Sequence, residues 1–198
     1  MKDIKDYIEW TFLKNSSKEE VIGFFEIAKK QKFHTLAIPA KWVDAAKVWN
    51  FSVIACIGFD LKKITEKDYI NLVNSTPNII ERYLPAKMIS SIDQKILRKE
   101  CWLAHTKGIR YRLVTECSEL TEEQFPLLVQ LLINIGANSL STSAGFSIPA
   151  EPELVQKLVN ILPKRIEVKA ASGINDLQKA QSLLDAGAKK IGTSKILE

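Results

Sequence analysis

Two short runs of small residues near the C-terminus are the first residues whose type and spacing suggest chemistry. One predicted strand begins at Ile166 and ends at Ser172-Gly173, and the next lies around Ile191 and ends at Gly192-Thr193-Ser194. Turns without bulky side chains let a ligand approach the backbone closely, and their N–H groups can bind an anion. The pattern therefore predicts an anion site, with tight packing of the turns as the alternative explanation.

The segment between these two runs positions them on one side of a sheet. Asn175 and Gln178 are three residues apart, as the N-cap of a helix and its N3 partner would be. The helix would bury one apolar face that includes Leu183, and Gly187 suits its C-terminal cap. A strand–helix–strand crossover of this kind requires a parallel sheet that helices cover.

The same unit repeats along the whole chain. The pattern predicts six earlier strands, at Tyr7–Leu13, Thr35–Pro39, Phe51–Phe59, Ile79–Leu84, Ile109–Glu116 and Ser139–Ser143. It also predicts helices between these strands. The first opens at a capping box, Ser17–Glu20, and the others cover Trp42–Val48, Glu66–Val73, Ile92–Lys107, Thr121–Gly136 and Glu153–Leu162.

Eight such units indicate an α/β protein with a closed (β/α)8 TIM barrel. An open doubly wound sheet is the alternative, but the chain carries no dinucleotide fingerprint to favour it. The chain has 198 residues, whereas such barrels typically need about 250. Only Lys195–Glu198 follow the eighth strand, so we expect a compact barrel whose last outer helix is truncated.

Composition narrows the class of protein. Hydrophobic residues make up 46% of the chain, enough for one domain that spans residues 1–198. No stretch approaches the roughly 18 apolar residues of a membrane span, and the first ten residues lack the apolar core of a secretion signal. The lysines behind the net charge of +5 are scattered, which favours solvated helix faces over a nucleic-acid surface.

The histidines and cysteines indicate neither a metal nor a cofactor. His34 and His105 fall on different predicted elements and form no relay or metal pair. Cys56, Cys101 and Cys117 show no paired spacing, which favours reduced thiols in a cytoplasmic protein.

Motifs along the whole chain, in order, resemble those of the deoxyribose-phosphate aldolases. These are class I aldolase barrels that convert 2-deoxy-D-ribose 5-phosphate to glyceraldehyde 3-phosphate and acetaldehyde. The opening YIEWTFLK resembles YIDHTLLK, ACIGF resembles VIGFP, and RLVTECSELTEE resembles KVIIETGELTDE. GANSLSTSAGF resembles GADFVKTSTGF, while VKAASGI and DAGAKKIGTS resemble VKASGGI and EAGADRIGTS. The resemblance implies a lyase-family barrel.

The resemblance also assigns the catalytic positions, with one loss. The family's Schiff-base lysine matches Ser141, whose hydroxyl cannot form an iminium ion. The second lysine matches Lys169, and the basic residue of strand five matches Arg112. The two carboxylates match Glu9 and Glu81.

The resulting set of two cations and two carboxylates is balanced, which favours the charged form of lysine over the nucleophilic form. The four side chains would then be a paired ionic core. The other interpretation is altered chemistry, in which Lys169 becomes the nucleophile, or Lys87 just beyond strand four does.

The phosphate site of the family is better preserved. It matches three turns, at Gly145-Phe146, Ser172-Gly173 and Gly192-Thr193-Ser194. The resemblance therefore implies that a phosphorylated small sugar or aldehyde binds to a homodimer, with lost or altered catalysis. The alternatives to an altered aldolase are a non-catalytic phosphosugar-binding barrel and a protein-interaction barrel.

Overall fold

The computed structural model describes residues 4–14, 16–60 and 64–197, and its parallel strands close into one barrel in the order β1 to β8. The strands are β1 (Ile8–Thr11), β2 (Thr35–Pro39), β3 (Ser52–Ile57), β4 (Ile79–Tyr83), β5 (Arg110–Val114), β6 (Ser139–Ser141), β7 (Glu167–Ala171) and β8 (Lys190–Thr193). Every neighbouring pair is parallel, including β1 with β8, so the TIM barrel predicted from the sequence is confirmed.

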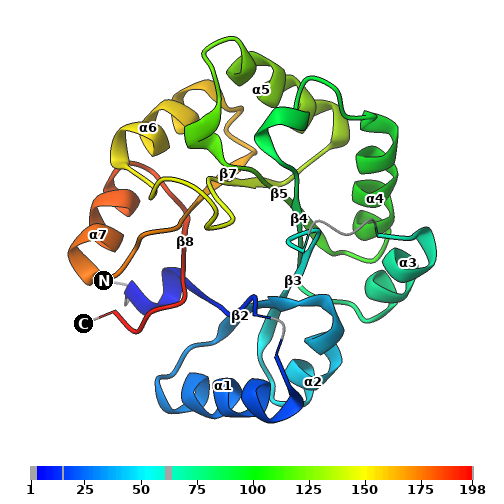
Figure 1. Ribbon diagram of the computed structural model, residues 1–198, viewed down its shortest axis with the longest axis vertical. Coiled ribbons are helices and arrows are strands. Elements are labelled where there is room, and N and C mark those ends of the chain that lie inside the picture. The colour runs from blue at the N-terminus through cyan, green and yellow to red at the C-terminus, as the bar shows by residue number, and fades with distance from the viewer. Residues whose placement is uncertain (1–3, 15, 61–63, 198) are drawn as a thin grey trace.

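Helices surround the barrel (Figure 1). They are α1 (Lys18–Lys30), α2 (Val43–Val48), α3 (Glu66–Asn74), α4 (Gln94–Thr106), α5 (Gln124–Ile135), α6 (Pro152–Ile161) and α7 (Leu177–Asp185). Short 3-10 helices are η1 (Ile4–Tyr7), η2 (Ala40–Trp42), η3 (Ala86–Met88) and η4 (Cys117–Glu119). Residues 194–197 form no helix after β8, and these residues and η1 lie in the gap between α7 and α1.

Local sequence signals explain several helix ends. The hydroxyl of Ser17 accepts from the N–H of Glu20, whose carboxylate accepts from the N–H of Ser17, so the predicted capping box is present. Gly136 ends α5 with a left-handed φ of 81°, a conformation that costs a residue with a Cβ atom more.

Two predicted helix starts are wrong. The N-cap of α7 is Asp176 rather than Asn175, because the carboxylate of Asp176 accepts from the N–H of Lys179 at 2.7 Å. The helix expected from Thr121 begins at Gln124, whose side-chain oxygen accepts from the N–H of Thr121 at 3.0 Å. Local hydrogen-bond competition therefore shifts both starts by up to a turn.

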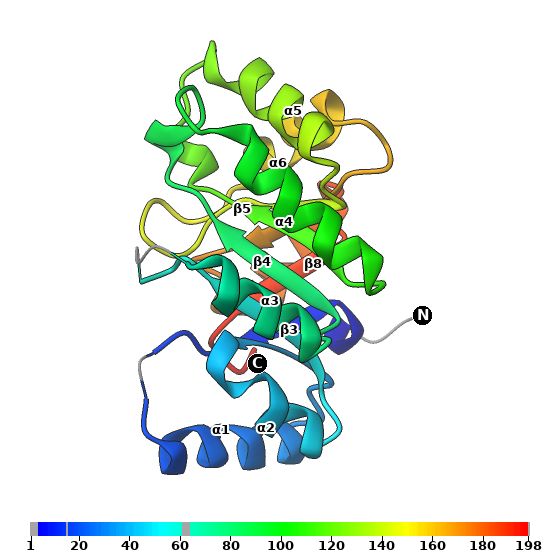
Figure 2. The ribbon, with the colours of Figure 1, turned by 90° about the vertical axis from the view of Figure 1, so that its right-hand side faces the viewer.

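Several strands are shorter than predicted. The stretch Phe51–Phe59 contributes only β3, and Ile109–Glu116 contributes only β5, because the chain leaves the ladder at the barrel mouth. Figure 2 shows the strands crossing the molecule at a slant beneath the helices. The residues that follow the strands are thus free to form the loops of the mouth.

The main apolar core lies between the barrel and the helices. Trp10 of β1 stacks on Phe24 of α1, with ring centroids 4.2 Å apart, and also on Phe33 at 4.9 Å. A small apolar cluster of Ala37, Ile54 and Cys56 fills the β2–β3 side of the interior. Polar and charged side chains occupy much of the remaining interior and are described below.

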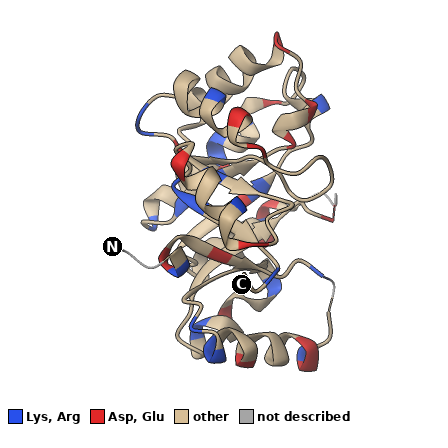
Figure 3. Ribbon diagram, turned by 90° about the vertical axis from the view of Figure 1, so that its left-hand side faces the viewer, with Lys and Arg blue, Asp and Glu red and all other residues tan. Residues whose placement is uncertain are grey.

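None of the described helices is long and apolar enough to cross a membrane. On the side of the molecule seen in Figure 3, acidic and basic residues are interspersed over the helices, strands and loops.

Candidate active site

Four charged side chains meet inside the barrel, and they are those that the sequence assigned to the catalytic positions. Glu9, Glu81, Arg112 and Lys169 are each at most 3% exposed. Arg112 donates to Glu9 at 2.5 Å and to Glu81 at 2.6 Å. The Nζ atom of Lys169 lies 2.9 Å from Glu9 and 2.7 Å from Glu81. Each cation thus contacts both carboxylates in a closed ring, which we call the ion ring.

The strands bring the ion ring together because alternate side chains of a strand point to the same face. Glu81 pairs in register with Arg112 across β4 and β5. Arg112 makes two further hydrogen bonds, from Nη2 to Glu9 and from Nε to the hydroxyl of Ser139, both at 3.0 Å. These hydrogen bonds offset part of the cost of burying four charges.

The charges of the ion ring set its protonation. Burial alone raises the pKa of the Glu9 carboxyl, but Arg112 and Lys169 outweigh it and lower the pKa to about 2. Burial likewise opposes ionisation of Glu81, whose pKa is lowered by Lys169 and then by Arg112. Burial would also lower the pKa of Lys169, but Glu81 and Glu9 raise it above its ordinary value. Lys169 is therefore an ammonium group at neutral pH and has no lone pair for attack on a carbonyl.

Ser141, at the position that the resemblance gives to the nucleophile, and Lys87, the other candidate replacement besides Lys169, lie in different places. Ser141 is 1% exposed, and its hydroxyl donates to the carbonyl of Ser143 at 3.3 Å. It faces Lys169 in the β6–β7 ladder. Lys87 is exposed in η3 and contributes nothing to the cavity described next.

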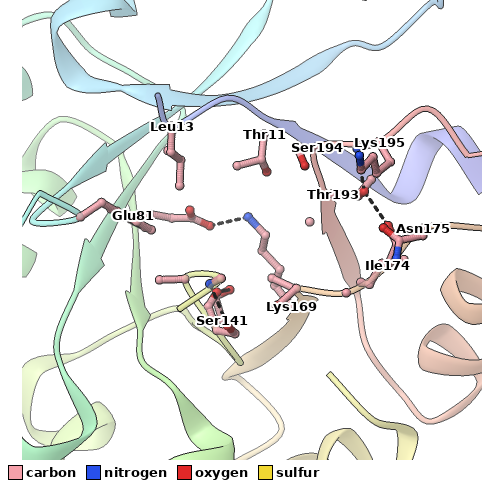
Figure 4. A pocket seen from close by; sticks show the side chains of 18 residues that line it. Thr11, Leu13, Glu81, Ser141, Lys169, Ile174, Asn175, Thr193, Ser194 and Lys195 are labelled. Atoms are coloured by element: carbon pink, nitrogen blue, oxygen red, sulfur yellow. Dashed lines mark hydrogen bonds and ion pairs between the residues drawn. The ribbon is translucent and has the colours of Figure 1, made fainter. Parts of the chain in front are cut away.

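A cavity of about 140 Å³ opens above the ion ring at the mouth of the barrel. Figure 4 shows Lys169 projecting into it toward Glu81, with Asn175, Thr193 and Lys195 at its other side. We call it the mouth pocket, and its lining comprises Thr11, Leu13, Phe59, Glu81, Ser141, Ser143, Ala144, Gly145, Lys169, Ala171, Ser172, Gly173, Ile174, Asn175, Gly192, Thr193, Ser194 and Lys195.

Two of the three predicted phosphate turns face the pocket with donors to spare. Within the part of the chain that the structure describes, the N–H groups of Gly173 and Ser194 donate to no protein acceptor. Ser172 adopts a left-handed φ of 80°, which turns the chain sharply above β7. Thr193 is engaged within the protein, because its hydroxyl donates to the carbonyl of Ile174 at 2.7 Å.

The third predicted turn is different. Gly145 lines the pocket, but its N–H donates to the hydroxyl of Ser143 at 2.8 Å. The N–H of Phe146 donates to Glu116 at 3.3 Å, and the Phe146 ring is 59% exposed outside the pocket lining. For these two residues, a role in phosphate binding requires other acceptors to be displaced first.

Glu116 and Cys56 are the residues near the site that sequence reasoning missed. The thiol of Cys56 points into the barrel and donates to Glu81 at 3.4 Å, and burial and then the charge of Glu81 raise its pKa. Glu116 lies two residues after the end of β5 and is 1% exposed. A carboxylate placed just after a buried strand is the signal that could have identified Glu116.

Comparison with known proteins agrees with this architecture. No family model matches the chain. The chain is 29% identical over 209 residues to a deoxyribose-phosphate aldolase of Geobacillus sp., with 97% of this chain and 92% of the relative covered. It is 26% identical over 208 residues to the enzyme of that name from Thermococcus gammatolerans, with 97% and 92% covered.

Solved structures give the same result. An aldolase described as QR15 superimposes with a TM-score of 0.85 at 25% identity, covering 98% of this chain and 92% of the other. The tetrameric deoxyribose phosphate aldolase of Aeropyrum pernix has the same fold, with a TM-score of 0.82, 21% identity, and 96% and 86% covered. The chain is therefore a TIM-barrel protein that is similar to deoxyribose-phosphate aldolases over nearly its whole length.

Proposed function

We propose that this barrel binds a phosphorylated small sugar or aldehyde in the mouth pocket and does not carry out Schiff-base aldol cleavage. The ion ring is the observation that carries the proposal. Lys169 is the one lysine that lines both the ion ring and the pocket among the described residues, and two carboxylates hold it protonated within 2.9 Å. Lys169 would have to lose a proton before it could attack a carbonyl, and the negative charges of Glu9 and Glu81 both oppose that loss.

The pocket itself supports ligand binding. Its volume of about 140 Å³ is many times the roughly 10–15 Å³ that one water needs. The unengaged N–H groups of Gly173 and Ser194 and the exposed side chain of Lys195 can together hold a phosphate at its outer end. At the inner end, the hydroxyl oxygens of Thr11 and Ser141 can accept hydrogen bonds from a sugar, and the ammonium group of Lys169, which has three donors, contacts only two carboxylates among the described residues.

Covalent trapping tests the catalytic half of the proposal. Incubation with 2-deoxyribose 5-phosphate and borohydride should leave the protein mass unchanged. A stable adduct mapped to Lys169 would instead establish it as a relocated nucleophile. In the variant Ser141→Lys, the introduced lysine would lie beside the protonated Lys169. The positive charge of Lys169 lowers the pKa of the introduced amine, so a borohydride-reduced adduct should form at position 141. This variant is the positive control for access of the sugar to the pocket.

Thermal stabilisation tests the binding half. A phosphosugar should raise the melting temperature, while the same sugar without phosphate should have little effect. Asn175→Asp adds a carboxylate to the pocket rim without changing the size of the side chain, and should abolish the shift. Asn160→Asp makes the same change on the exposed surface of α6 and is the matched control. If no phosphorylated ligand raises the melting temperature at millimolar concentration, a protein-interaction barrel becomes the better proposal.

The assembly and location of the protein are also proposed. We expect a homodimer, because Leu177 and Ile196 are 38% and 42% exposed beside the gap between α7 and α1. The three cysteines are free and buried, which supports a reducing compartment such as the cytoplasm.

A further inference from the structure

The turn that follows β6 is held by a single buried carboxylate. Glu116 accepts four hydrogen bonds from this turn, whose donors are Ser143 Oγ at 2.5 Å, Ser147 Oγ at 2.7 Å, Ala144 N at 2.8 Å and Phe146 N at 3.3 Å. The turn comprises residues 143–147, and we call it the β6 turn.

This arrangement is an anion site that the chain itself fills. Successive backbone N–H groups in a tight turn, with two hydroxyls, form the kind of concavity that binds phosphate or carboxylate. The carboxylate of Glu116 can only accept hydrogen bonds, and four donors nearly saturate its two oxygens. The turn therefore has few donors left for an anion from solution.

The β6 turn is also a wall of the mouth pocket. Ser143, Ala144 and Gly145 line the pocket, and Phe146 packs edge-on against Tyr83 of β4 with ring centroids 5.3 Å apart. The backbone next to Glu116 is fixed as well, because the N–H of Cys117 donates to the carbonyl of Thr142 at 2.9 Å. The position of this wall thus depends on the anchor that Glu116 provides.

We propose that Glu116 is a positioning residue that fixes the β6 turn. Because Glu116 accepts the hydrogen bonds of N–H groups in the β6 turn, the anionic end of a ligand binds instead at the turns that end β7 and β8. The second part of this inference rests on the proposed phosphate site, whereas the first part does not. It differs from the expectation that all three turns share the phosphate.

Amide NMR spectra of the ligand-free protein test the positioning role. Glu116→Ala removes all four acceptor contacts, so the amide signals of Ala144 and Phe146 should shift strongly from their wild-type positions. Glu116→Gln keeps an oxygen where Ala144 and Phe146 both donate, and should restore most of the wild-type signals. Glu119→Ala, at an exposed residue three positions along, is the matched control and should leave the turn unchanged.

Titration of the wild-type protein with inorganic phosphate tests where the anion binds. The amides of Gly173 and Ser194 should shift, and those of Ala144 and Phe146 should not. Equal shifts at both places would overturn the exclusion by Glu116. A titration that moves no amide would overturn the proposed phosphate site and the direction of the anion together.

The two experiments fail separately. The ligand-free comparison decides the positioning role even when no phosphate binds. A Glu116→Ala protein with an unchanged turn, or a Glu116→Gln protein as disturbed as the alanine variant, would contradict it. If Glu116→Ala does not fold, the Glu116→Gln spectrum and the wild-type titration still give a decision.

Discussion

A Cβ atom at position 192 would lie 2.5 Å from Cε of Lys169, so Gly192 is what gives the Lys169 side chain its path beside β8. The same atom would lie 3.2 Å from Nζ of Lys169 and 3.2 Å from Cβ of Ala171. Gly192 therefore has a structural task inside the barrel in addition to its predicted place in the phosphate turn. The small residue that suggested an anion site also permits the ion ring.

Replacement of Gly192 tests this relationship. Gly192→Ala should lower the free energy of unfolding by about 1–3 kcal/mol, the usual cost of overpacking, because Lys169 must leave its place between Glu9 and Glu81. Gly23→Ala in α1 is the control, since an added Cβ there meets no atom within 4 Å and should stabilise by about 0.5–1 kcal/mol. Chemical denaturation gives both values, and a neutral effect at position 192 would contradict the proposed path.

The ion ring should respond sharply to loss of one partner. Arg112→Met leaves two buried carboxylates with Lys169 as their one remaining cation, and should lower the free energy of unfolding by about 3–5 kcal/mol. Arg110→Gln removes a cation two positions earlier on β5, where the ion pair with Glu167 is exposed, and should cost less than about 1 kcal/mol. Similar losses in the two variants, measured by urea unfolding, would show that burial of the ring is unimportant.

The pH dependence follows from the lowered carboxyl pKa values. In the folded state the pKa of Glu9 is about 2, against 4.5 for the free group, so the unfolded chain binds protons first as the pH falls. This group contributes about 3 kcal/mol that is present above pH 4.5 and is lost as the pH falls toward 2. Unfolding curves between pH 7 and pH 3 should show the loss, and Glu9→Gln should reduce the slope. An equal slope in both proteins would exclude Glu9 as its source.

Assembly should depend on the surface between α7 and α1. A cavity of about 190 Å³ there is lined mainly by apolar residues that include Phe33, Leu177 and Ile196. Light scattering at micromolar concentration should show a dimer, and Ile196→Glu should shift it toward monomer by placing a charge in the contact. Ile96→Glu, at a 53% exposed position on α4, should leave the dimer intact. A monomeric wild-type protein would refute the proposed contact.

The sequence by itself determined the barrel and the identity of the charged side chains within it. Strands alternate with helices along the chain as far as the eighth strand, and each unit must bury its apolar face against the next, so a barrel is favoured by a local pattern. Motif order placed Glu9, Glu81, Arg112 and Lys169 on four different predicted strands, and the structure brings these four side chains together inside the barrel. That these four side chains comprise two cations and two carboxylates follows from the sequence without any distance.

Only the tertiary structure decided which polar groups are still available for a ligand. Hydrogen bonds between loops depend on side chains that are distant in the sequence, such as Glu116 and Ser147. Gly145 after β6 and Gly192 near the end of β8 give similar sequence signals. The N–H groups of Ala144 and Phe146 donate to the buried carboxylate of Glu116, whereas the N–H of Ser194 donates to no protein acceptor among the described residues. Gly145 and Gly192 thus carry the same sequence signal for different physical reasons, because the neighbours that decide their roles come from other strands.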